Sequence, residues 1–210
     1  TWPAVSGAVG YEVELTTIDR AASTPEEALL HEYDFAKFES KTVGFTDISS
    51  KLGDYGMSNW TGSKLYTTPS KLRFGTSTTT GTLKSPWWYT PASTNATLAM
   101  GVDGVKSEST VKGTVSIANA DVEEGGYIGN TENMDPLNFE DTGNQKLVLC
   151  LKDMRRAAYQ FQIAPNTQMY MNYLAIYDGE WTAEQLGISN TPAPAPRRAA
   201  TVETFTTTTN

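Results

Sequence analysis

The sequence predicts an all-β protein, a β-sandwich, and three observations lead to this prediction. The composition includes 30 threonines, which favour strands, and 17 glycines, which favour turns. Short apolar segments follow one another between turn residues, with little helical periodicity. In residues 159–163 (YQFQI), three large apolar side chains alternate with two glutamines, as expected of a strand with one buried face.

Length and charge limit the classes of partner. A chain of 210 residues is long enough to bury a hydrophobic core without disulfides. Its net charge of −8 repels phosphate backbones, so we expect no nucleic-acid partner. We also expect no membrane insertion, because no apolar stretch approaches the ~20 residues that span a bilayer. Cys150, the single cysteine, lies in the apolar run 146–152 (KLVLCLK) and is predicted to be a buried, inert thiol.

Residues 1–18 contain a glycine turn followed by the alternating strand pattern YEVEL. The pattern W-x-A-V-x-G-A-x-G-Y-E-V resembles the B–C hairpin of a fibronectin type III domain. That resemblance implies that Trp2 anchors a core, but 18 residues are too few for a whole domain. Because the chain begins within a strand pattern, we expect it to be part of a longer multidomain chain.

Residues 19–30 are predicted to be a linker with a short helix. Thr24 can cap the helix, Pro25 suits its first position, and Glu27 can close a capping box. We expect this helix to extend through Leu30 and to carry no chemistry.

Residues 31–187 form the predicted sandwich. Their alternating or apolar segments predict strands at 32–38, 41–45, 64–67, 71–75, 81–84, 94–102, 109–117, 146–152, 158–163 and 168–177. Residues 122–142 are rich in glycine, asparagine and acids and are predicted to be one or two long loops. Binding sites in sandwiches usually lie on such loops.

Three segments of this region carry a family resemblance. They are residues 71–77 (KLRFGTS), 81–86 (GTLKSP) and 173–178 (YLAIYD). They resemble the jelly-roll modules of bacterial surface adhesins and secreted hydrolases, which have cleaved-adhesin and galactose-binding-like folds. The resemblance implies a jelly roll, an extracellular or cell-surface location, and a glycan or surface protein as partner.

The C-terminal part contains a turn, a linker and one strand. Residues 181–187 (WTAEQLG) predict a capped helical turn that ends at Gly187. Prolines make 188–199 a semi-rigid linker, and 200–210 resembles another strand of a fibronectin type III domain. The jelly roll is therefore either placed between two such domains or inserted into one. Chain ends at matching strands slightly favour insertion.

No catalytic constellation stands out, so we predict a protein that is not an enzyme. His31 is the only histidine, and neither a serine nor the cysteine lies in a nucleophile elbow. One histidine and one cysteine are too few for the usual zinc sites. Glycoside hydrolysis needs only a pair of carboxylates, and the many acidic residues leave a glycan-active hydrolase open as the weakest reading.

The jelly-roll resemblance implies a structural Ca²⁺ held by carboxylates of the first and last strands. Asp34 and Glu39 are the candidate ligands of the first strand. Asn172 stands near the place where the family has an aspartate, a departure that weakens the prediction.

Aromatic side chains are the candidate ligand contacts, since exposed rings can stack against sugar faces. Consecutive strand residues point to opposite faces, so at least one of two neighbouring tryptophans should face away from the core. The candidates are Trp60, Trp87, Trp88, Tyr89 and Tyr127. The sequence thus predicts a non-catalytic adhesion or carbohydrate-binding module. The alternative is a structural spacer, which is favoured if Trp87, Trp88 and Tyr127 are all buried.

Overall fold

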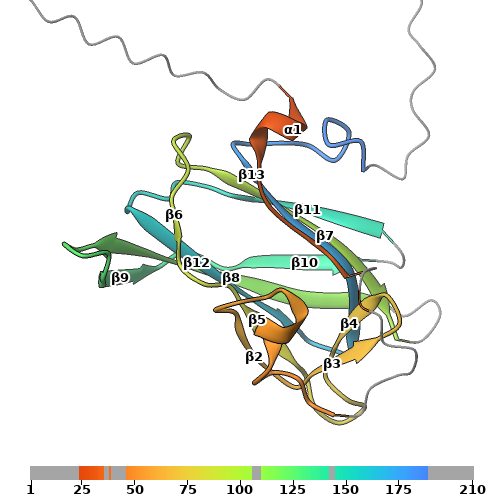
Figure 1. Ribbon diagram of the computed structural model, residues 1–210. Coiled ribbons are helices and arrows are strands. Elements are labelled where there is room, and N and C mark those ends of the chain that lie inside the picture. Colours follow the sequence, from red (N-terminus) through yellow and green to blue (C-terminus); the bar gives the residue numbers. More distant parts are fainter. Residues whose placement is uncertain (1–23, 36–37, 39–45, 106–109, 142–144, 189–210) are drawn as a thin grey trace, which may run out of the picture.

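The computed structural model describes residues 24–35, 38, 46–105, 110–141 and 145–188, and it is almost entirely β-structure. Two antiparallel sheets pack face to face around one main core (Figure 1). From β10 onwards, successive strands alternate between the sheets, as in a jelly roll. The predicted β-sandwich is confirmed. The fibronectin-like segments at 1–18 and 200–210 lie outside the described residues.

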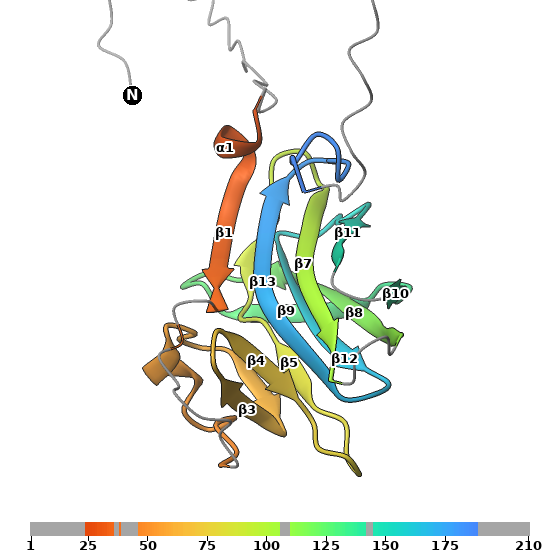
Figure 2. The same ribbon diagram turned by 90° about the vertical axis from the view of Figure 1, so that its right-hand side faces the viewer.

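The first sheet has six strands, and β13 is at its centre. Its order is β11 (Gln145–Leu151), β7 (Ala96–Gly104), β13 (Met169–Asp178), β4 (Lys71–Phe74) and β3 (Leu65–Thr68). Strand β1 (Leu29–Asp34) also pairs with β13, with Asp34 opposite Tyr173. Figure 2 shows β1 and β13 side by side.

The second sheet has seven strands, and β8 and β12 are at its centre. Its order is β10 (Leu137–Asp141), β8 (Val111–Val122), β12 (Ala158–Pro165), β5 (Thr82–Lys84) and β2 (Thr61–Ser63). Two further strands extend it: β6 (Trp88–Tyr89) pairs with β12, and β9 (Ile128–Asn133) pairs with β8.

The alternation that predicted β12 matches its burial. Tyr159, Phe161 and Ile163 are almost completely buried, whereas the two glutamines between them lie on the outer face. Phe161 and Ile163 pair with Ile117 and Val115 of β8, so the apolar faces of both central strands point into the sandwich. Period-two alternation therefore positions the core.

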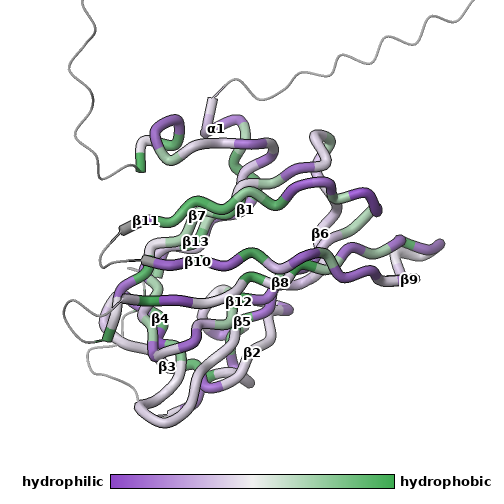
Figure 3. The backbone as a smooth tube through the Cα atoms, turned by 180° about the vertical axis from the view of Figure 1, so that it is seen from behind, coloured by the Kyte–Doolittle hydropathy of each residue, from purple (hydrophilic) through white to green (hydrophobic). Residues whose placement is uncertain are grey.

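The predicted loop at 122–142 is wrong. Most of this segment forms β9 and β10, which pair with the two halves of β8. The prediction failed because β9 is a polar edge strand, almost wholly exposed, and has no apolar alternation to detect. Its hydrophilic character is visible in Figure 3.

The helix predicted to extend through Leu30 is shorter. Helix α1 (Pro25–Ala28) is capped by Thr24, whose hydroxyl accepts a hydrogen bond from the Glu27 N–H at 3.3 Å. Leu29 and Leu30 instead begin β1: Leu29 pairs with Tyr177 of β13, and Leu30 lies at a register irregularity before His31. The predicted strand at 41–45 lies outside the described residues.

The predicted helical turn at 181–187 is present. The Thr182 N–H donates to Gln185 Oε1, and the Gln185 N–H donates to the Thr182 hydroxyl. Gly187 follows with a φ of 63°, which suits glycine at a helical end. None of the helices among the described residues has the length and apolar character to cross a membrane.

Candidate functional site

Two of the predicted ligand-binding tryptophans take part in core packing: Trp60 lies in the core, and the half-buried Trp88 packs against it. Trp60 is 5% exposed, and its indole N–H donates to the Tyr33 hydroxyl at 3.0 Å. Trp88 packs edge-on against Trp60 and also contacts Phe161, with ring centroids 5.6 and 5.7 Å apart. These contacts bring together residues of β1, β6 and β12, so the two rings serve packing rather than an exposed platform.

His31 completes this aromatic cluster. Its imidazole stacks on Trp88, with ring centroids 4.2 Å apart and an interplanar angle of 18°. Burial lowers the pKa of His31 below its ordinary value of 6.5, because the charged form is poorly solvated there. This environment fits a structural histidine.

The two predicted tyrosines are exposed, but they lie apart from each other. Tyr89 is 74% exposed and is paired with Ala158 of β12. Tyr127 is 73% exposed in the turn between β8 and β9, after two glycines with positive φ. Trp87 is half-buried. The five predicted rings therefore do not converge on one site.

A cleft that the sequence did not indicate lies between β1 and the short helix η2 (Leu52–Tyr55). We call it the aromatic cleft, and its volume is about 460 Å³. Its lining residues are Glu32, Tyr33, Asp34, Phe35, Phe38, Asp54, Tyr55 and Gly56.

Local structure positions the rings of the aromatic cleft. Phe38 follows β1, and its ring lies 5.2 Å from Phe35 and 5.3 Å from Tyr55 between centroids. Tyr55 ends η2 and is 37% exposed. Gly56 terminates the helix with a φ of 78°, and its N–H donates to the Leu52 and Gly53 carbonyls. Tyr55 is therefore held at the edge of the cleft by a capped helix end.

Carboxylates line the same cleft. Glu32 and Asp34 are exposed and two residues apart on β1, so they share a face, and Asp54 comes from η2. Carboxylate oxygens accept hydrogen bonds from hydroxyl groups, whereas aromatic rings contact apolar ligand faces. The cleft therefore combines the two kinds of contact that a polyhydroxylated ring ligand needs. Sequence reasoning missed Tyr55 and Asp54 because a single tyrosine and aspartate in a short turn form no pattern.

The predicted calcium ligands are only partly described. Asp34 is opposite Tyr173, and Asn172 is the irregular residue next to Tyr173 in β13. The side chain of Asn172 lies over Gly101. Glu39 lies outside the described residues. Within the described ranges, no three His, Cys, Asp or Glu side chains gather closely enough to hold a metal.

The pKa of Tyr173 is affected by the carboxylates of β1. Burial raises the pKa of Tyr173, its hydrogen bond with Tyr177 adds to the shift, and the charges of Glu32 and Asp34 contribute further. The ammonium of Lys146 lies 4.6 Å from the centroid of the Tyr173 ring. This face of the first sheet is therefore polar and acidic beside β1.

Cys150 is half-buried on β11 rather than fully buried. Burial raises the pKa of its thiol, and the nearby Glu180 carboxylate raises it further. The thiol is therefore mostly protonated at neutral pH, in agreement with the predicted inert cysteine.

Comparisons with known proteins give a distant structural likeness and no family. No protein-family model matches the chain, and no curated protein matches it. A solved structure described as "CBM4 structure and function" is similar to it, with 13% identity over 61% of this chain and 83% of that chain. The TM-score is 0.33, so neither the fold nor the function rests on this likeness.

Proposed function

We propose that this chain is a non-catalytic carbohydrate-binding or adhesion module of an extracellular or cell-surface protein. A glycan would bind in the aromatic cleft. The observation that supports this proposal is that the Tyr55 ring and three carboxylates line the same open cleft. The extracellular location rests on the strand motifs at 71–77 and 81–86, which resemble those of adhesin modules.

The binding mode follows from these groups. One sugar ring would stack its C–H face against Tyr55, while its hydroxyls donate to Asp54 on one wall and to Glu32 or Asp34 on the other. Charge-assisted hydrogen bonds of this kind are stronger than neutral ones, so the carboxylates would orient the sugar. The Tyr55 ring would provide apolar contact area, and the carboxylates would fix the orientation of the sugar.

Isothermal titration of the whole chain with soluble neutral polysaccharides and their hexaoses tests the proposal. We expect Tyr55→Ala and Asp54→Asn each to weaken binding about tenfold, as expected from losing ~1.4 kcal/mol of contact. Tyr89→Ala is the matched control, because it removes an exposed tyrosine outside the cleft. If no glycan binds the wild-type chain, the spacer alternative replaces this proposal.

A glycan-active hydrolase is the second candidate, and the three carboxylates of the aromatic cleft favour it. Hydrolysis needs two carboxyl groups about 5 to 10 Å apart on either side of the bond that is cleaved. Release of reducing ends from the same polysaccharides measures this activity. We expect none. Turnover that disappears in both Asp54→Asn and Glu32→Gln would establish the hydrolase instead.

A structural Ca²⁺ beside Asp34 stays a prediction. Its ligands would be Asp34, Asn172 and Glu39, of which Glu39 lies outside the described residues. If the ion binds, adding Ca²⁺ should raise the melting temperature relative to EDTA, and Asp34→Asn should remove the difference. Equal melting curves in Ca²⁺ and EDTA would contradict the prediction.

A further inference from the structure

A second cleft lies at one end of the sandwich, where three loops meet. These are the β4–β5 loop (residues 75–81), the β7–β8 loop on either side of residues 106–109, and the β12–β13 loop (residues 166–168). The cleft has a volume of about 450 Å³, and none of its lining residues lines the aromatic cleft. We call it the threonine cleft.

Hydroxyl and amide side chains dominate its walls. The lining consists of the run Thr76-Ser-Thr-Thr-Thr80, the run Asn166-Thr-Gln168, Val105 and Thr110. Among these described lining residues there is no charged side chain and no aromatic ring. The described lining of the cleft is therefore uncharged, and nearly all of its side chains can donate or accept hydrogen bonds.

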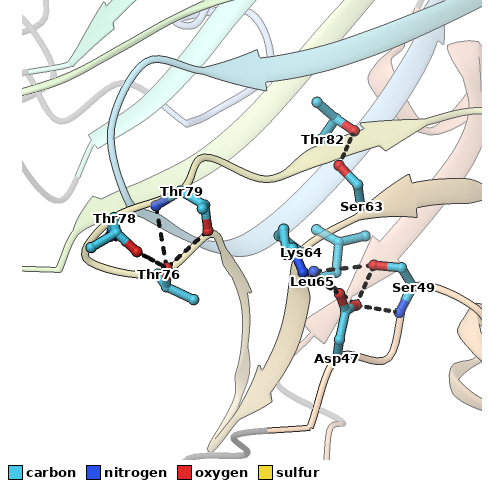
Figure 4. A network of polar contacts seen from close by, with 9 residues as sticks. All are labelled: Asp47, Ser49, Ser63, Lys64, Leu65, Thr76, Thr78, Thr79 and Thr82. Atoms are coloured by element: carbon cyan, nitrogen blue, oxygen red, sulfur yellow. Dashed lines mark hydrogen bonds and ion pairs between the residues drawn. The ribbon is translucent and has the colours of Figure 1, made fainter.

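The β4–β5 loop has a defined conformation. The Thr76 hydroxyl accepts hydrogen bonds from the N–H groups of Thr78 and Thr79 and lies 2.8 Å from the Thr79 hydroxyl (Figure 4). Gly75 has a φ of 78°, and a Cβ there would come within 2.3 Å of the Thr79 carbonyl. The loop therefore closes on itself at Gly75 and holds its hydroxyls in place.

The β12–β13 loop is hydrogen-bonded to the surrounding elements. Gln168 Nε2 donates to the Gly75 carbonyl at 3.3 Å, and the Asn166 N–H donates to the Lys112 carbonyl at 2.7 Å. These bonds join the β12–β13 loop to the β4–β5 loop and to strand β8. A ligand would meet walls that are already organised, which lowers the entropic cost of binding.

Several hydroxyls of the cleft remain available. The structure records no hydrogen bond from the side-chain hydroxyls of Ser77, Thr80, Thr110 or Thr167 to another described residue. All four residues are exposed. Their environment favours an uncharged ligand, because a charged one would lose water without gaining an opposite charge.

We propose that the threonine cleft is a second glycan site, which takes neutral sugar units through hydroxyl and amide hydrogen bonds. The inference rests on the same ligand class as the proposed function but on a separate set of residues. Because the site has no ring for stacking, its affinity depends on the geometry of the hydrogen bonds, and each missing hydroxyl of the protein weakens it.

Amide-resolved NMR titration of the whole chain tests both clefts at once. The probes are neutral hexaoses of β1,4-linked glucose, xylose and mannose, each up to about 10 mM, which detects a Kd of about 1 mM. We expect the cross-peaks of residues 77–80 and 166–168 to shift with at least one hexaose. The triple variant Thr80→Val, Thr110→Val, Thr167→Val should weaken this binding at least about tenfold.

Two further variants keep the result interpretable. Thr131→Val removes an exposed hydroxyl of β9 outside the cleft and should bind like the wild type. Thr167→Trp fills the cleft and should abolish the shifts there while the rest of the spectrum stays folded. The Thr167→Trp variant replaces the triple variant in the binding test if the triple variant fails to fold.

Each outcome decides between the two sites. Shifts confined to Asp34 and residues 54–56 would overturn the second site and leave the proposed function standing. Shifts confined to the threonine cleft would support the second site and overturn the aromatic one. No shift with any of the hexaoses, or a triple variant that binds like the wild type, would overturn the inference.

Discussion

His31 stacks on Trp88, and we expect the burial of its imidazole there to make the stability of the protein depend on pH. Burial lowers the pKa of His31 in the folded state below its ordinary value of 6.5. Below that value the unfolded chain takes up the proton first, so the histidine disfavours folding as the pH falls. Its contribution to stability is complete above pH 6.5 and is lost progressively below it.

Urea unfolding between about pH 7 and about pH 5 measures this contribution while most carboxylates stay ionised. We expect the free energy of unfolding of the wild type to decrease towards pH 5. In His31→Phe, which keeps an aromatic ring against Trp88, the decrease should be smaller. An identical slope in the variant would show that other groups carry the pH dependence.

At the residue scale, the sequence identified the aromatic residues but not their exposure. Trp60 lies in the core and the half-buried Trp88 packs against it. Tyr33, His31 and Phe161 contact these two rings from strands far away in the chain. Tyr89 is exposed because it occupies the other face of a two-residue strand. Strand alternation predicted that neighbouring rings separate, but only packing decides which ring is buried.

At the element scale, β8 contains a position where two neighbouring strands approach closely. Gly113 is paired with Phe139 of β10 and with Pro165 of β12. A Cβ at Gly113 would come within 2.4 Å of the Phe139 ring and 2.7 Å of the Pro165 Cα. The second contact is with backbone, which cannot move aside as a flexible side chain can.

We therefore expect Gly113→Ala to destabilise the protein by about 1–3 kcal/mol, the usual cost of overpacking. Gly53→Ala in η2 is the control, because its Cβ would meet nothing closer than the Ser58 hydroxyl at 4.0 Å. Chemical denaturation of both variants measures the difference. Equal stability of the two variants would show that the sheet opens at Gly113 without cost.

Elements were predictable where the decisive interactions are local. The reciprocal Thr182 and Gln185 bonds and Gly187 define the last helical turn within seven residues. In contrast, β9 carries no apolar alternation and is a strand only because β8 provides hydrogen-bonding partners. The sequence could not indicate β9, since its pairing depends on the register of the hairpin.

At the scale of the whole molecule, the first and last described segments, α1 and residues 181–188, lie side by side at the top of Figure 1. Ala28 of α1 forms a small apolar cluster with Tyr177, and Trp181, Leu186 and Ile188 pack against it. Adjacent ends are what insertion of this domain into a host domain requires.

We predict that residues 24–188 fold without the flanking segments, because the described residues already form a core cluster that draws on both sheets. The excised segment should unfold cooperatively, with a melting temperature within a few degrees of the whole chain. Circular dichroism of both proteins measures this. A segment that is unfolded or melts without cooperativity would show that the flanking segments belong to the same folding unit.

The sequence by itself determined the all-β class, most strands of the sandwich and the caps of its helical turns. These features depend on alternation, turn residues and hydrogen bonds over a few positions. Only the tertiary structure decided which aromatic rings are exposed and where clefts form. The aromatic cleft joins β1 to η2, and the threonine cleft joins loops from three parts of the chain. Their residues meet because of the register of distant strands, which no local pattern contains.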